Sequence, residues 1–352
     1  DLLPTFCELA GAPVPLGVDG VSIAPTLLGE GHQRRRDFLI HEAGNGQSII
    51  RGKRKLVRGK GGRVQLFDLE TDHSETDDIA AKHPRLVKEL RALLLDERVD
   101  EPKGFAVTYH HWLGKDGGDV ARAANWSNYR YANAGITYMT DDGPPRLSWV
   151  AHMTNSKAKP NTAHVESNAE FLALQIGGDE SGPQSLVVAP DAHLTGSNEI
   201  RLAPNGVLNI NGGKVSVLRW VEIFPGGKLR GDGVIEGILY NDGSMEVGGS
   251  SESQLQIVGD YHQTAGAKLS ISHSGDDAAS LVILGDALLD GTLQVAWKPK
   301  ENQNPDSAVT ILSAKTIDGR FNNPHDEVVT ADGRRFAIVY GANTVRLAPK
   351  PR

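Results

Sequence analysis

The sequence predicts an α+β segment followed by an all-β domain of the solenoid type, and three observations support this fold class. Residues 49–69 alternate apolar with basic residues around a glycine-rich turn at 59–62, a pattern typical of short antiparallel strands. Residues 84–98 form an amphipathic pattern that begins with a proline, as many helices do. In the second half of the chain, short strand-like runs recur between glycine-rich corners, which is typical of stacked coils.

The N-terminal part predicts a small antiparallel sheet covered by one helix. Residues 2–10 and 23–28 are expected to be short helical segments, because each pattern is followed by a glycine. Residues 38–41 predict a strand that precedes the strand-turn-strand pattern. We expect this domain to span residues 1–101, since a charged stretch with a proline at position 102 marks a linker.

Residues 102–164 are expected to form a linker and an aromatic-rich approach to the second domain. This segment holds several large aromatic side chains: Trp112, Trp126, Tyr129, Tyr131 and Trp149. His110 and His111 precede Trp112 and suggest a metal or sugar site. Adjacent residues of a strand point to opposite faces, so we do not expect these two histidines to share one site.

Residues 165–352 predict a parallel β-helix or solenoid-like domain. A small residue, one variable residue and a large apolar residue recur, with apolar anchors spaced 14, 21, 16, 24 and 24 residues apart. The anchors are Leu194, Leu208, Leu229, Met245, Leu269 and Leu293. Coils of this kind stack to share one core. Strands at 308–313, 336–340 and 344–347 are expected to cap the stack, and an antiparallel sandwich is the alternative.

Composition excludes several classes of partner and structure. The 352 residues carry a net charge of −7, which does not favour nucleic-acid binding. No apolar run approaches the roughly 20 residues that a membrane-spanning helix needs. The chain has one cysteine, so it cannot form an intrachain disulfide.

The N-terminal domain also resembles a known family. The letters GKRKL at 52–56, QLFDLETD at 65–72 and ETDDIA at 75–80, with DLLPT at 1–5 and LAG at 9–11, are similar to the C-terminal part of formylglycine-dependent, arylsulfatase-type sulfatases. Phe67, His73 and Asp78 stand where that family has Tyr, Pro and Asn. The resemblance covers residues 1–101. The loose repeat of the second domain, with its Asn125-Trp126 pair, resembles the passenger regions of autotransporter-type proteins.

The sulfatase resemblance implies an enzyme that hydrolyses sulfate esters of sugars with a formylglycine nucleophile and a bound calcium ion. The formylglycine is made from the cysteine of a Cys-x-Pro-Ser-Arg motif, or of a close variant of this motif. Cys7 is followed by Glu-Leu-Ala-Gly, so we assign it to the core of the first helix. No catalytic residue, cofactor or metal ligand can be carried over to this chain.

Three further expectations follow from the resemblance. Residues 1–5 begin inside a family motif, so we expect the chain to be a fragment or a mispredicted gene product. Its partner would be the missing N-terminal catalytic domain. The intact protein would be secreted, periplasmic or on the cell surface. The alternative function is a secreted β-solenoid adhesion or glycan-binding module with a vestigial sulfatase remnant.

Candidate substrate-binding residues lie in and near a basic stretch. Residues 51–63 hold seven basic residues and no acidic one, and Arg51, Lys53, Arg54 and Lys55 are the candidates for binding a sulfated carbohydrate. The alternative is a solvated strand surface. His41 and Asn45 sit in a turn that, by the resemblance, would face the rim of the active-site cleft, and the alternative there is an ordinary surface turn. The acidic run at 68–78 is expected to be a structural turn, because it lacks the mid-loop glycine of a calcium-binding EF-hand.

Overall fold

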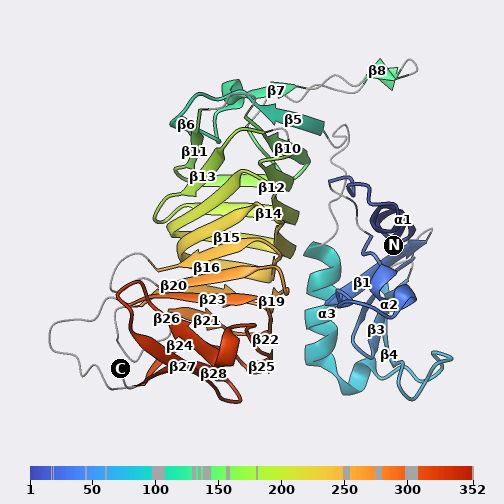
Figure 1. Cartoon of the computed structure of the whole chain (residues 1–352). Coiled ribbons are helices and arrows are strands. Elements are labelled where there is room, and N and C mark those ends of the chain that lie inside the picture. Colours follow the sequence, from blue (N-terminus) through green and yellow to red (C-terminus); the bar gives the residue numbers. More distant parts are fainter. Residues whose placement is uncertain are drawn as a thin grey trace. The chain divides into compact units, whose positions relative to one another are not determined.

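The computed structural model describes residues 1–16, 18, 20–43, 46–59, 62–96, 108–128, 132–133, 136–137, 144–155, 159–179, 181–248, 254–273, 280–297 and 308–350. The chain forms two compact units, Asp1–Phe105 and Ala106–Arg352 (Figure 1). None of the helices in these described segments is long and apolar enough to cross a membrane.

The helices of the first unit confirm the predicted positions. They are α1 (Leu2–Leu9), α2 (Ala24–Leu28), the 3-10 turn η2 (Ala80–Lys82) and α3 (Pro84–Asp96). The second helix ends at Gly29, whose φ of 70° lies in the left-handed region that glycine adopts without strain. The structure describes α3 only as far as Asp96, two residues short of the predicted end.

The four-stranded sheet of the first unit is antiparallel, as predicted. Its order is β1-β2-β3-β4, with bounds Phe38–Ala43, Gly46–Arg51, Arg54–Arg58 and Val64–Asp68. One face buries Ile49, Leu56 and Leu66 against Leu90 and Leu94 of α3. Burial of such a side chain contributes about 1.5–3 kcal/mol, so this contact stabilises the pairing of α3 with the sheet.

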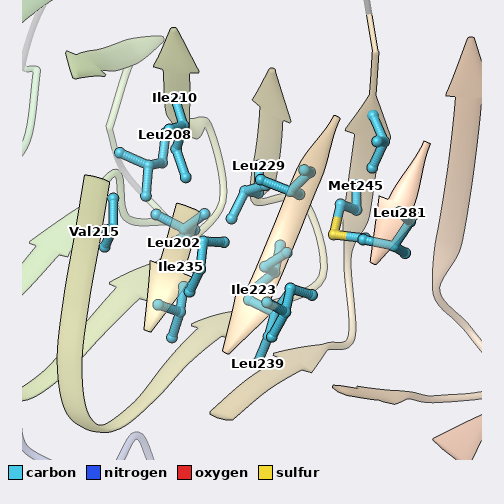
Figure 2. Packing of buried hydrophobic residues seen from close by; sticks show 14 of the residues in the cluster. Leu202, Leu208, Ile210, Val215, Ile223, Leu229, Ile235, Leu239, Met245 and Leu281 are labelled. Carbon is cyan, nitrogen blue, oxygen red and sulfur yellow. The ribbon is translucent and has the colours of Figure 1, made fainter. Parts of the chain in front are cut away.

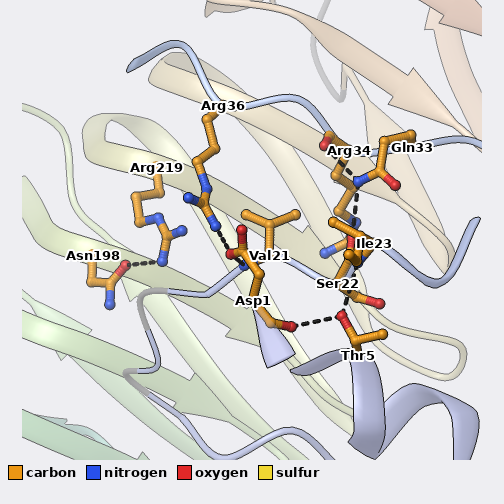
Figure 3. A network of polar contacts seen from close by, with 10 residues as sticks. All are labelled: Asp1, Thr5, Val21, Ser22, Ile23, Gln33, Arg34, Arg36, Asn198 and Arg219. Atoms are coloured by element: carbon orange, nitrogen blue, oxygen red, sulfur yellow. Dashed lines mark hydrogen bonds and ion pairs between the residues drawn. The ribbon is translucent and has the colours of Figure 1, made fainter. Parts of the chain in front are cut away.

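Polar contacts tie α1 to the segment before α2 (Figure 3). The Asp1 carboxylate accepts a hydrogen bond from the Val21 N–H at 2.9 Å and pairs with Arg36. The Thr5 hydroxyl donates to the Asp1 carbonyl at 2.6 Å and accepts from the Ile23 N–H at 3.0 Å. Because Thr5 is buried, these bonds satisfy polar atoms that would otherwise lack partners.

The second unit is a β-solenoid in which parallel strands of successive coils pair along three faces (Figure 1). The first face holds β6 (Gly118–Asp119), β11 (Asn161–Val165), β13 (Gln184–Val188), the starts of β15 (Gly206–Ile223) and β16 (Lys228–Asn241), β17 (Ser244–Val247), β20 (Lys268–His273) and β23 (Thr292–Trp297). These ladders are parallel, so the alternative of an antiparallel sandwich is wrong for this part of the chain.

The other two faces are built in the same way. The second face holds the starts of β12 (Asn168–Ile176) and β14 (His193–Leu202), the middles of β15 and β16, and β18 (Leu255–Val258), β21 (Leu281–Ile283) and β24 (Val309–Ser313). The third face holds β5 (Thr108–Trp112), β10 (Trp149–Met153), the ends of β12, β14, β15 and β16, and β19 (Tyr261–Gln263), β22 (Asp286–Leu289) and β25 (Thr316–Gly319). Strands β5 and β10 therefore belong to the solenoid, although they lie in the expected approach segment.

The predicted apolar anchors all belong to one core, and Figure 2 shows three of them, Leu208, Leu229 and Met245. Five of them, from Leu208 through Leu229, Met245 and Leu269 to Leu293, occupy one row of the first face in register. The assumption that Leu194 is an earlier copy of this position is wrong, because Leu194 pairs with Val215 on the second face. Leu186 is the residue in register with Leu208. Each coil contributes several inward-pointing side chains, on all three faces. The pattern of a small, a variable and a large apolar residue therefore does not show to which face an anchor belongs.

Glycine is required at the corners of the tightest coil. Gly231, Gly233 and Gly237 have φ values of 109°, 118° and 135°. A Cβ atom on Gly231 would lie 2.0 Å from the carbonyl oxygen of Ile210 in the preceding coil. The prediction of glycine-rich corners is confirmed for this coil, and the physical reason for glycine here is the close approach of two backbones.

Both ends of the solenoid depart from the parallel pattern. Strand β7 (Trp126–Asn128), which follows the 3-10 turn η3 (Ala123–Asn125), pairs antiparallel with β5, and Trp126 packs edge-on against Trp112 and Trp149. The short strands β8 (Ala132–Asn133) and β9 (Ile136–Thr137) pair with each other.

At the C-terminal end, a 3-10 turn η4 (Pro324–Asp326) precedes three more strands. These are β26 (Glu327–Val329), β27 (Arg335–Tyr340) and β28 (Thr344–Pro349), which pair antiparallel and join β24. The predicted terminal strands are thus confirmed.

Candidate functional site

The predicted basic residues gather around the hairpin between β2 and β3. Arg51 ends β2, Lys53 lies in the turn, and Arg54 and Lys55 begin β3. Arg51 and Arg54 are opposite each other in the antiparallel register. The four residues therefore belong to one hairpin.

Each of the four basic side chains is paired with an acid. Arg51 contacts Glu89 of α3 at 2.5 Å and Asp37 at 2.9 Å. Lys55 contacts Glu75 at 2.5 Å. Lys53 pairs with Glu70, and Arg54 pairs with Asp68, its cross-strand partner on β4. The positive charges of these four residues, which are neighbours in the sequence, are therefore balanced by nearby carboxylates in the fold.

The candidate residues are also divided between the two faces of the sheet. Arg51 and Arg54 are each two residues from a side chain buried against α3, Ile49 and Leu56 respectively, so they lie on the α3 face. Lys55 alternates with these and lies on the opposite face, where it is in register with Phe67. His41 is exposed near the end of β1, and Asn45 lies outside the described residues. The described candidates do not converge on a single pocket.

The acidic run at 68–78 is engaged by its own backbone. The Asp72 carboxylate accepts hydrogen bonds from the N–H groups of Thr76 and Asp77, both at 2.8 Å. The Asp77 N–H is the main cause that lowers the pKa of Asp72. Asp78 accepts from the N–H groups of Ala80 and Leu66, in that order of effect, and its pKa is lowered likewise. These carboxylates close turns and do not point toward a common cation.

Other candidate ligands do not assemble a metal centre in the described part of the chain. Within those residues, no three His, Cys, Asp or Glu side chains are grouped to hold a metal ion. Cys7 lies half-buried in α1 as a free thiol.

His110 and His111 point to opposite sides of β5, as predicted. The His110 ring is buried, stacks on Trp149 with ring centroids 3.4 Å apart, and places Nε2 2.8 Å from the Thr108 hydroxyl. His111 points outward and stacks on His152 of the next coil, with centroids 5.3 Å apart. Burial, followed by the nearby charge of His111, lowers the pKa of His152 to about 4. The pairing of His111 with His152 depends on register and has no signal in the sequence.

A second polar cluster that sequence reasoning missed lies on the outer side of the second face. The Ser216 hydroxyl donates to Glu236 at 2.7 Å and lies 2.8 Å from Nε2 of His193. Lys214 pairs with Glu236 at 2.8 Å and is the main cause that lowers the pKa of this carboxylate. These residues come from three successive coils and satisfy one another, which is the arrangement of a surface ladder.

Comparison with known proteins identifies relatives of part of the chain. No protein-family model matches it. The Delta 4,5-hexuronate-2-O-sulfatase of Bacteroides thetaiotaomicron is 34% identical over 107 residues, which are 27% of this chain and 22% of that protein. The N-acetylgalactosamine-6-O-sulfatase of the same organism is 27% identical over 111 residues, with the same shares of each chain. A solved 2-O GAG sulfatase is 30% identical, covers 30% of this chain and 26% of its own, and has a TM-score of 0.27.

The comparisons concern only a minority of each protein. The chain spans 22% of the length of the curated relatives it matches. The region similar to these sulfatases makes up about 27% of this chain, and the β-solenoid is a separate unit of the structure.

Proposed function

We propose that this chain carries the C-terminal part of a sulfatase that hydrolyses sulfate esters of sugars, joined to a β-solenoid accessory domain. The observation that supports this most directly is the 34% identity over 107 residues to a curated hexuronate sulfatase. The motifs at 52–56, 65–72 and 75–80 are further sequence support for it. The proposed location of the intact protein is outside the cytoplasm, where sulfated polysaccharides occur.

The described residues do not fit the formylglycine and calcium that an intact enzyme of this kind would use. Cys7 lacks the Pro-Ser-Arg context, and the carboxylates of Asp72 and Asp78 are committed to backbone N–H groups. We therefore assign no catalytic step to this chain. Its proposed role is to complete the fold of a catalytic domain that supplies the reacting groups.

An apolar patch on α1 and α2 is the proposed contact with that catalytic domain. Six side chains of the two helices are each between 51% and 66% exposed, namely Leu2, Leu3, Phe6, Leu9, Leu27 and Leu28. The two helices are held together by the bond from the Ile23 N–H to Thr5. Exposed apolar side chains gathered on two neighbouring helices are typical of a protein interface, because their exposure to water is unfavourable.

A chimeric enzyme tests this proposal. The 107 matching residues of the Delta 4,5-hexuronate-2-O-sulfatase would be replaced by those of this chain, and sulfate release from a 2-O-sulfated unsaturated hexuronate would be measured. We expect turnover, because the transplanted segment completes the fold. The control chimera carries Leu3→Asp and Phe6→Asp, which place charges in the apolar patch and should prevent assembly. A chimera that melts cooperatively like its parent but releases no sulfate would contradict the proposal.

A further inference from the structure

The outer side of the first face presents two columns of side chains in register along the solenoid. The first column runs Thr162, Ser185, Val207, Lys228, Ser244, Lys268 and Thr292. The second runs His164, Val187, Asn209, Arg230, Glu246, Ser270 and Gln294. All of these side chains are half-buried or exposed, as expected for the water-facing side of a sheet. The columns form a long, polar surface.

This surface is positively charged although the chain as a whole carries −7. It holds Lys228, Arg230 and Lys268 against two carboxylates. Glu246 pairs with Lys228 at 2.7 Å, and Asp119 of β6, in register with His164 at the start of the second column, accepts a hydrogen bond from the Ala121 N–H at 3.0 Å. Throughout the part of the chain that the structure describes, no carboxylate forms an ion pair with Arg230 or Lys268. Two cations are therefore available to an anionic ligand.

Asp232 and Asp290, two carboxylates at corners next to this face, are engaged by other groups. Asp232 accepts a hydrogen bond from the Gly212 N–H at 3.0 Å. Asp290 accepts from the Gly291 N–H at 2.7 Å and from the Asn322 side chain at 2.6 Å. The second face is different in character, because its Lys214 is paired with Glu236 and its later rungs expose Val258 and Leu284.

The spacing of the cations suits a linear ligand. Neighbouring parallel strands lie about 4.8 Å apart, so Lys228 and Lys268, two rungs apart through Ser244, are separated by roughly 10 Å along the axis. Arg230 lies in the adjacent column beside Lys228. The rung between the two lysines holds Ser244 and Glu246, and the other rungs of the two columns carry the hydroxyl and amide groups of Thr162, Ser185, Asn209, Ser270, Thr292 and Gln294. Such groups donate to and accept from sugar hydroxyls. A polymer that lies along the axis can contact both Arg230 and Lys268, whereas a small anion would contact one of them.

We propose that the outer side of the first face binds a linear sulfated polysaccharide aligned with the solenoid axis. Sulfate oxygens would accept hydrogen bonds from Arg230 and Lys268, and the hydroxyl and amide columns would contact the sugar rings. The choice of sulfate as the anion rests on the proposed sulfatase function. The charge and flatness of the surface do not depend on it.

Affinity measurements on the full chain test this binding surface. The probes are dextran sulfate, unsulfated dextran and hyaluronan, which carries carboxylates but no sulfate. We expect binding to dextran sulfate only. The variant Arg230→Gln/Lys268→Gln should bind about 3- to 10-fold more weakly, since each exposed charge contact is worth a modest energy. Both side chains point to solvent, so this variant should melt at the temperature of the unchanged chain.

Two control variants separate this surface from the remaining cations. Lys315→Gln/Arg320→Gln removes two exposed charges elsewhere on the second unit, and Arg51→Gln/Arg54→Gln removes the paired cations of the first unit. Both should bind dextran sulfate as the unchanged chain does. Equal weakening by either control, unchanged affinity of Arg230→Gln/Lys268→Gln, or equal binding of hyaluronan would overturn the proposal. A chimera that melts like its parent but releases no sulfate, together with the expected binding, would contradict the proposed sulfatase function alone.

Discussion

Leu229 and Met245 face each other in register in adjacent coils of the solenoid, and both are fully buried. Only 16 positions separate them in the sequence, the shortest step between neighbouring anchors of the first face. The coil can be this short because Gly231, Gly233 and Gly237 turn its corners with positive φ. The core position is thus maintained while the length of the coil varies.

Truncation at Leu229 should therefore have a local effect. We expect Leu229→Ala to lower the free energy of unfolding by about 2–5 kcal/mol, because it leaves a cavity between two coils. Amide hydrogen exchange should increase first between residues 194 and 257, since coils contact mainly their neighbours. The matched control, Val258→Ala on the outer side, should change little. Equal loss of protection at 309–312 would show that the solenoid does not open locally.

The chain by itself should not hydrolyse sulfate esters. No described residue is placed as a sulfatase nucleophile, and the acidic side chains of the 68–78 run are held by the backbone or by basic side chains. The measurement is sulfate release from an aryl sulfate by purified protein with calcium added. A matched sample with Cys7→Ser excludes a contribution from the free thiol. Turnover above the buffer background that disappears in Cys7→Ser would show that our assignment of this residue is wrong.

The first unit should self-associate when it is produced alone. Residues 1–101 would expose the apolar patch of α1 and α2, and water favours its burial between molecules. Sedimentation velocity should show species larger than a monomer that increase with concentration. The variant Leu3→Ser/Phe6→Ser should shift the population toward monomer. A monomeric unchanged segment that melts cooperatively would contradict this expectation.

Acid should weaken the second face through Glu236. Lys214 and Ser216 lower the pKa of Glu236 in the folded chain, so the folded state binds a proton less readily than the unfolded state. The stabilisation is therefore complete above the unfolded pKa of about 4.3 and is lost as the pH falls through the lower folded value. At pH 6 the melting temperature of the unchanged chain should be higher than that of Glu236→Gln. This difference in melting temperature should disappear near pH 3. The exposed control Glu170→Gln should show no such pH-dependent difference.

The sequence predicted local features that depend on neighbouring residues. The C-terminal end of α2 and the start of α3 follow from Gly29 and Pro84, whose backbone preferences act within one turn. The apolar anchors from Leu208 to Leu293 were found because burial of a large side chain in every coil leaves a repeating pattern. The acidic turn at 68–78 was recognised as structural from its missing glycine.

Long-range pairing was decided only by the tertiary structure. The sequence showed a basic stretch, but Glu89 of α3 and Asp37 come from distant positions to neutralise Arg51. It also showed Leu194 as an anchor without revealing that this residue belongs to the second face. The stacking of His111 on His152, and the columns that hold Arg230 and Lys268, likewise depend on register. Register could not be counted along this chain because its coils differ in length, so the fold itself determines which outward side chains become neighbours.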